Sequence, residues 1–204
     1  NARLRTAVQA ARDANMPKDT MDRAIKKGAG ELEGMNYEDM TYEGYGPAGV
    51  AIFIEASTDN KNRTASEIRH LFSKYNGNLG EGGCVSWMFN KKGQILIPAE
   101  GVDEDSLMEA ALDAGAEDVR NEGENFTVLT EWTEMLDVRQ ALEGKGFKIE
   151  SATVSMIPTT TVKVEGKDAE TLMKLINALE ENDDVNTVSA NYDIDDAVME
   201  KLMG

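Results

Sequence analysis

The order of strands and helices predicted between residues 94 and 156 constrains the fold more than any other feature of the sequence. Alternating or continuous apolar runs indicate strands, and apolar residues spaced three and four apart indicate helices. The predicted elements are strand 94–98, helix 103–114, strand 117–121, strand 126–131, helix 133–144 and strand 147–156. This βαββαβ order is the ferredoxin-like pattern, so the predicted fold class is α+β.

Two incomplete units of strand, helix and strand flank this segment. The predicted elements before it are strand 48–56, a helix begun by the capping box Thr64-x-x-Glu67, strand 85–89 and a turn at 91–93. Those after it are strand 160–165, helix 168–181, strand 185–192 and a short helix capped by Asp195. Paired, the two units would form a second ferredoxin-like domain with residues 93–157 inserted in it. The local pattern equally allows a tandem arrangement.

Two short helices are predicted at the start of the chain. The first, residues 3–16, carries an apolar stripe, and Pro17 opens a second helix that ends at Gly28. Two such helices cannot bury a core alone, so we expect a third helix from a part of the protein before Asn1 to complete a bundle. Residues 28–46 are Gly-rich, acidic and aperiodic, which predicts a linker.

The charge is divided unevenly along the chain. The net charge is −17, yet residues 1–92 carry 13 Lys and Arg against 12 Asp and Glu, whereas residues 93–204 carry 8 against 26. Such asymmetry predicts a basic surface for nucleic acid and an acidic part that faces solvent or a basic protein partner. The candidate nucleic-acid-binding residues are Arg3, Arg5, Arg12, Lys18, Arg23, Lys26, Lys27, Lys61, Arg63, Arg69, Lys74, Lys91 and Lys92.

The sequence offers no catalytic, cofactor or metal site. The lone Cys84 opens an apolar strand and the lone His70 lies on the polar side of a helix, so we expect no nucleophile–base pair. The glycine-rich loop 77–83 follows a helix and lacks the lysine of a phosphate-binding loop. Asp193-x-Asp195-Asp196 departs from the pattern of a calcium loop and is better interpreted as a helix cap. Trp87 and Phe89 could stack on bases, but their alternation places them in the core.

Three runs of residues resemble the YebC/PmpR family. They are NMPKDTMDRAIKKGAGELEG, YEGYGPAGVA and TDNKNRTASEIRHLFSKYNGNLGEGGCVSWMFNKKG, and the resemblance extends from Asn1 to about Tyr192. It implies a helical domain (1–37), a second domain (38–92 with 158–204) and a third domain (93–157) inserted in the second. It also implies a further Lys- and Arg-rich segment before Asn1.

The resemblance implies a regulator without enzymatic activity. Members are described as probable DNA-binding transcriptional regulators, and relatives include a mitochondrial translational activator. The alternative is therefore a translation factor that binds ribosomal RNA and relieves stalling. A third hypothesis is an interaction module whose acidic part, 93–204, binds a basic protein. No signal peptide or apolar run of spanning length is present, so a cytoplasmic protein without membrane contact is expected.

Overall fold

The computed structural model describes residues 1–29, 37–195 and 197–199. The chain divides into two compact units, with boundaries between Asn90 and Lys91 and between Ser155 and Met156. One unit combines the N-terminal helices with residues 91–155, and the other combines the residues on either side of that segment. Helices and antiparallel sheets are both present, which confirms the predicted α+β class.

The chain starts with two exposed helices, α1 (Ala2–Asp13) and α2 (Lys18–Gly28). The side chain of Asn1 caps α1 by accepting a hydrogen bond from the amide of Leu4 at 3.3 Å. No residue of either helix is buried. Their apolar side chains instead line a groove of about 540 Å³ in which Leu4 is 45% and Ile25 38% exposed. The third helix expected to complete this bundle stays a prediction.

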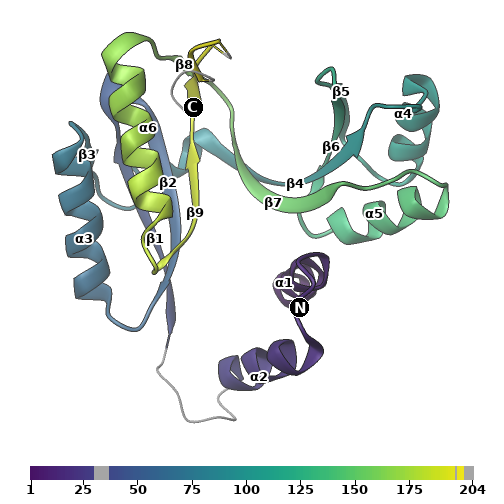
Figure 1. Ribbon diagram of the computed structural model, residues 1–204, viewed down its shortest axis with the longest axis horizontal. Helices are drawn as coiled ribbons and strands as arrows, with labels where there is room; N and C mark the ends of the chain where they lie inside the picture. The colour runs from purple at the N-terminus through teal and green to yellow at the C-terminus, as the bar shows by residue number, and fades with distance from the viewer. Residues whose placement is uncertain (30–36, 196, 200–204) are drawn as a thin grey trace. The chain divides into compact units, whose positions relative to one another are not determined.

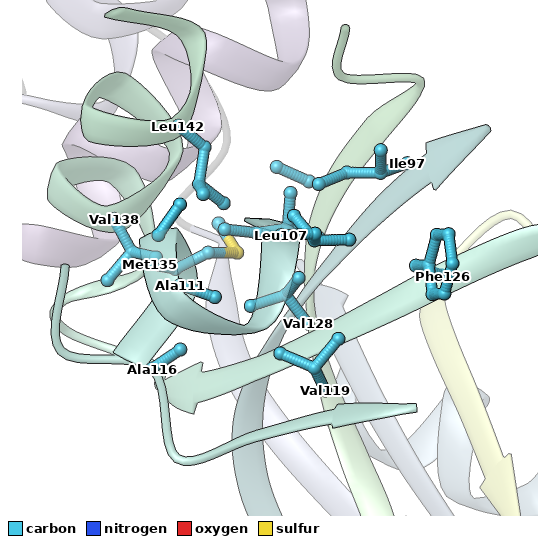
Figure 2. Packing of buried hydrophobic residues seen from close by; sticks show 13 residues of the cluster. Ile97, Leu107, Ala111, Ala116, Val119, Phe126, Val128, Met135, Val138 and Leu142 are labelled. Atoms are coloured by element: carbon cyan, nitrogen blue, oxygen red, sulfur yellow. The ribbon is translucent and has the colours of Figure 1, made fainter. Parts of the chain in front are cut away.

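The segment after Asn90 has the ferredoxin-like topology. Its elements are β4 (Phe89–Pro98), α4 (Glu104–Asp113), β5 (Asp118–Asn121), β6 (Asn125–Glu131), α5 (Met135–Gly144) and β7 (Ser151–Pro158). The strands lie in the order β5-β6-β4-β7, and β6 pairs antiparallel with both β4 and β5. Buried side chains from the sheet, such as Ile97 and Val128, pack against Leu107 of α4 and Leu142 of α5 (Figure 2).

The second unit is a four-stranded sheet with two helices. Its elements are β1 (Glu38–Tyr45), η1 (Pro47–Gly49), β2 (Ala51–Thr58), α3 (Lys61–Lys74), β3 (Asn78–Leu79), η2 (Ser86–Met88), α6 (Gly166–Glu180) and β9 (Val185–Ala190). The strand order is β3-β1-β2-β9, and a short parallel pair joins β8 (Val162–Lys163) to β10 (Tyr192–Asp193). Helices α3 and α6 lie side by side against the sheet (Figure 1).

Residues of β2 alternate between two apolar clusters on the two faces of this sheet. Ile52 and Ile54 are fully buried against α3 and α6, in a cluster that includes Phe72 and Leu172. Ala51 and Phe53 face the opposite side, where Val85 and Phe89 pack on them. The segment from Cys84 to Phe89 therefore covers the sheet face that the helices leave open.

The predicted linker over residues 28–46 is wrong from Glu38 onward, because β1 occupies this part of the chain. Residues 30–36 of the predicted linker lie outside the described residues. The sequence of β1 does not indicate a strand because it contains acidic residues and a glycine. Glu43 and Gly44 are both buried, and each depends on groups about 30 to 40 residues later in the chain.

The predicted strand 85–89 and turn 91–93 are also wrong. Residues 86–88 form the 3-10 turn η2, and β4 begins at Phe89 and continues through Gly93 without a turn. Gly93 is needed for packing rather than for turning. A Cβ atom there would lie 2.4 Å from Oγ1 of Thr130 and 2.6 Å from Cβ of Met135.

The predicted capping box is wrong as well. Asn60 caps α3, since its side chain accepts a hydrogen bond from the amide of Arg63 at 3.1 Å. Thr64 lies inside the helix and is fully buried. The predicted helix cap over residues 193–196 and the short helix predicted after it lie partly outside the described residues, which omit 196 and 200–204. Within the described part, the carbonyl of Asp195 accepts hydrogen bonds from the amides of Val198 and Met199.

Candidate nucleic-acid interface

The basic residues predicted on the first two helices are all exposed. Arg5 forms an ion pair with Asp137 of α5 in the same unit, at 2.7 Å. Four others make no ion pair or side-chain hydrogen bond with any described residue. These four cations, the head cations, are Arg12, Lys18, Arg23 and Lys26.

Arg23 and Lys26 lie three residues apart on α2, so they are neighbours on the helix surface. Lys26 and Lys27 occupy the last turn, where positive charge complements the helix dipole. Asp19 occupies the first turn for the same reason. The dipole explains the positions of the terminal charges, but it leaves the exposed guanidinium of Arg23 and the exposed ammonium of Lys26 available to an anionic ligand.

The basic residues on α3 divide into paired and unpaired groups. Lys61 forms an ion pair with Glu38, and Lys74 lies 5.1 Å from the centre of the Tyr75 ring. Arg69 is exposed and makes no ion pair with any residue in the described part of the chain. Arg63 is held by two carboxylates, those of Asp59 and the buried Asp184.

The carboxylate of Asp184 anchors Arg63 and two threonines. Asp184 is 8% exposed and accepts hydrogen bonds from Oγ1 of Thr64 at 2.6 Å and from Nη2 of Arg63 at 2.8 Å. Thr58, at the end of β2, donates to the same oxygen at 3.3 Å. The Thr64 hydroxyl and the Arg63 guanidinium hold the pKa of Asp184 below its usual value. This network joins β2, α3 and the start of β9, which gives Arg63 a structural role.

The two lysines of β4 are engaged by neighbours in the same unit. Lys92 contacts Glu117 at 2.8 Å and also Glu131. Lys91 lies over the ring of Trp132, 5.1 Å from its centre. The charge of Lys92, one of the predicted nucleic-acid-binding residues, is therefore neutralised by neighbouring carboxylates. Both carboxylates belong to the acidic part of the chain, residues 93–204.

The part of the second unit's sheet face that the segment from Cys84 to Phe89 leaves uncovered is acidic rather than basic. In the pairing of β1 with β2, Thr41 lies opposite Glu55 and Asp39 opposite Ser57, so these side chains share one face. Asp39 accepts a hydrogen bond from Ser57. A sheet that binds RNA by stacking bases needs exposed aromatic side chains on its strands rather than acidic ones. Nucleic acid contacts are therefore expected at helices or loops of this chain, not on this sheet.

The loop before β4 is built around a buried carboxylate. Glu43 is 5% exposed and accepts hydrogen bonds from the amides of Gly83, Val85 and Ser86 at 2.7 to 2.8 Å. Burial opposes ionisation, but the three amides together hold the pKa of Glu43 below its usual value. Because these amides are occupied, the loop cannot use them to hold a phosphate.

This anchored loop presents Trp87 to solvent, which overturns the prediction of a core position. Trp87 is 70% exposed, whereas Phe89 is buried as predicted. The indole Nε1 donates to the carbonyl of Cys84 at 3.1 Å, which fixes one edge of the ring. The prediction failed because it assumed a regular strand, whereas the 3-10 turn η2 rotates Trp87 away from the sheet.

His70 and Cys84 are not brought together. His70 lines a groove between α3 and α6, on the helical side of the sheet. Cys84 packs with Ala51 and Phe53 on the opposite side. Burial and the nearby carboxylate of Glu43 raise the pKa of the Cys84 thiol, which disfavours the thiolate.

Among the described residues, no three potential metal ligands cluster, and no helix is long and apolar enough to cross a membrane.

Comparison with known proteins gives matches along nearly the whole chain. A family model described as the TACO1/YebC second and third domain matches residues 37–192, and one described as the TACO1/YebC protein N-terminal domain matches residues 1–31. A probable transcriptional regulatory protein from Geobacter sulfurreducens is 57% identical over 203 residues, which span 100% of this chain and 82% of that protein. A probable transcriptional regulatory protein from Geobacter sp. (strain M21) is 55% identical over the same shares.

A solved structure is also similar. It is the crystal structure of a conserved hypothetical protein from Aquifex aeolicus, 49% identical in sequence with a TM-score of 0.84. The match covers 96% of this chain and 81% of that chain. The two folds therefore agree over almost all of the residues compared.

Proposed function

The chain belongs to the TACO1/YebC family, and from this premise we propose that it is a non-enzymatic regulator that binds nucleic acid through the head cations. Regulatory activity is what the names of its relatives state. Nucleic-acid binding through α1 and α2 goes further and rests on the charges of these two helices.

The observation that carries the proposal is the difference between engaged and unengaged cations. Arg5, Lys61, Arg63 and Lys92 each have a carboxylate within ion-pair distance. The head cations have none among the described residues and project from short, exposed helices. A phosphate that binds an unengaged cation displaces only water and counterions, whereas one that binds Lys92 must displace two carboxylates.

Duplex DNA is the first candidate ligand, in keeping with the relatives' description as probable transcriptional regulatory proteins. Ribosomal RNA is the second candidate, and the composition of α2 favours it. The helix sequence KDTMDRAIKKG contains no Asn or Gln, the side chains that read adenine in the major groove. Contacts restricted to phosphates suit a structured RNA that is recognised by its backbone.

The test is a triple charge reversal, Lys18→Glu, Arg23→Glu and Lys26→Glu, with binding measured by fluorescence anisotropy. The probes are a labelled 24-base-pair DNA duplex and a labelled single-stranded RNA. Each lost phosphate contact makes the negative slope of log binding constant against log salt concentration shallower, by about 0.9 on duplex DNA and about 0.7 on a single strand. We therefore expect the magnitude of the slope to decrease by about 2 to 3, with at least a roughly tenfold loss of affinity at low salt.

The matched control reverses three exposed lysines that are not part of α1 or α2: Lys148→Glu, Lys167→Glu and Lys174→Glu. Both triple variants change the net charge equally, so the control separates a local surface from a global effect of charge. Equal losses in the two variants would contradict the assignment to α1 and α2. Full affinity in the first variant would contradict it as well.

A sucrose gradient separates the two candidate ligands. Tagged protein in a DNase-treated lysate should migrate with ribosomal particles at physiological salt if ribosomal RNA is the ligand. Protein that stays at the top of the gradient, but binds the DNA duplex by anisotropy, would favour DNA.

A further inference from the structure

Trp87 has the largest exposed fraction of the big apolar side chains in the described part of the chain, at 70%. The other tryptophan, Trp132, is half-buried and lies beneath Lys91. In η2 the indole of Trp87 presents a flat apolar ring to solvent, a shape on which a planar ligand can stack.

The loop holds this indole in a fixed position. Val85 and Phe89, on either side of η2, are buried against the sheet, and the Glu43 carboxylate binds three amides of the loop. The hydroxyl of Tyr45 donates to the carbonyl of Cys84 at 3.2 Å, the same oxygen that accepts the indole N–H. The ring is therefore ordered before any ligand arrives, which reduces the entropy lost on binding.

The surroundings of Trp87 favour a flat ligand with polar edges. Its neighbours in sequence, Ser86 and Met88, are only half-buried, and Asn90 is exposed. Thr159 packs beside this turn, where its amide and its hydroxyl both donate to the carbonyl of Met88. Thr159 and the next residue, Thr160, are exposed. The exposed residues next to this turn in sequence or by hydrogen bonding, Asn90, Thr159 and Thr160, are polar, so Trp87 lacks the apolar surroundings of a protein-binding hot spot.

A nucleobase has this combination of an apolar face and hydrogen-bonding edges. The indole N–H is already satisfied, so the face of the ring stays available to such a ligand, and the Thr159 hydroxyl, whose proton is donated to the carbonyl of Met88, can still accept a hydrogen bond. Phosphate is a poorer fit, because the loop amides that could bind it are taken by Glu43. A base inside a duplex is covered by its neighbours, so the base that stacks here must be unpaired.

We propose that Trp87 is a stacking platform for an unpaired base of single-stranded nucleic acid. The inference rests on the proposed function, which supplies the nucleic acid, and adds that an unpaired segment contacts the second unit. A purely duplex ligand would leave Trp87 unused.

The test uses Trp132→Phe protein, in which Trp87 is the only tryptophan, and a 12-nucleotide oligouridylate. Stacking should quench the fluorescence of Trp87, and the quenching should saturate at the same concentrations as anisotropy of the labelled oligonucleotide. Trp87→Ala should weaken binding about 5- to 150-fold, the range that corresponds to ~1–3 kcal/mol for one stacked base. Trp87→Phe, which keeps an aromatic face, should recover part of the affinity.

Controls separate this inference from the proposed function. Because Trp87 is exposed, Trp87→Ala should leave the urea midpoint of unfolding unchanged, and binding to the DNA duplex should not weaken. Binding of the oligonucleotide without quenching, or with full affinity in Trp87→Ala, would overturn the stacking role and leave the function standing. Failure to bind either the oligonucleotide or the duplex would overturn both.

Discussion

The Asp184 network provides a direct test of whether Arg63 is a structural residue or a contact to nucleic acid. Replacing Asp184 with alanine removes the acceptor of two buried threonine hydroxyls and of the Arg63 guanidinium. Hydrogen bonds to a charged group contribute about 1.5–3 kcal/mol each. The Arg63 guanidinium can be solvated by water instead, so losing its ion pair with Asp184 changes the unfolding free energy little. The two hydroxyls then set the expected loss at roughly 3 kcal/mol of unfolding free energy at pH 7.

The pH dependence supplies an independent check. The pKa of Asp184 is lowered in the folded protein by the Thr64 hydroxyl and the Arg63 guanidinium, so the unfolded chain binds a proton more readily. The stabilisation is therefore complete above the unfolded value of about 3.9 and is lost as the pH falls through the folded value. Urea unfolding followed by circular dichroism should show a large difference between wild type and Asp184→Ala at pH 7. The difference should be smaller below about pH 3.

Two results would refute this reasoning. A loss below about 1 kcal/mol at pH 7 would mean that the buried carboxylate is dispensable. A difference that stays constant across the pH range would mean that the charge of Asp184 is irrelevant.

The matched pair Arg63→Ala and Arg69→Ala tests whether Arg63 stabilises the fold or contacts nucleic acid. Arg63→Ala should lower the urea midpoint and spare nucleic-acid binding, and Arg69→Ala should leave the midpoint unchanged.

Two further substitutions test the packing of β1. Glu43→Gln leaves one acceptor oxygen for three amide donors and should lower the unfolding free energy by roughly 3 kcal/mol. It should also lower the fluorescence anisotropy of Trp87 in Trp132→Phe protein, and unchanged anisotropy would show that other contacts hold the loop. Gly44→Ala places a Cβ atom 2.6 Å from the carbonyl oxygen of Asn78 and 2.7 Å from the ring of Phe72, so urea unfolding should show a loss of about 1–3 kcal/mol or more. Gly28→Ala, where the added atom meets open space, should be neutral or slightly stabilising, and an equal loss in both variants would contradict the clash.

The inserted ferredoxin-like segment could be predicted because its elements follow local rules. Its strands and helices have regular apolar spacing, and the observed bounds of α4, β5 and β6 lie within one residue of the predicted ones. β1 could not be predicted in this way. Its central residues are stabilised by contacts distant in sequence, since Glu43 needs the amides of residues 83–86 and Gly44 needs the close approach of Asn78 and Phe72.

The candidate site shows the same division between local and distant information. Composition and spacing identified the basic residues, and the structure places the head cations on exposed helices. The sequence could not reveal which cations were already paired, because Arg63 meets Asp184 and Arg5 meets Asp137 more than 100 residues away. The alternating pattern predicts Trp87 in the core, because a 3-10 turn such as η2 leaves no signal in such a pattern.

Counting only the four head cations, rather than all thirteen candidate cations, changes the salt dependence expected for nucleic-acid binding. Thirteen phosphate contacts on duplex DNA would give a slope of about −12, whereas four contacts from the head cations would give about −3.6. The net charge of −17 does not argue against such binding, because acidic side chains already partner the cations that face them, as Glu117 and Glu131 do for Lys92. A measured slope near −4 would therefore support a small phosphate-binding surface on α1 and α2. A slope steeper than about −8 would mean that nucleic acid displaces the carboxylates and engages the paired cations as well.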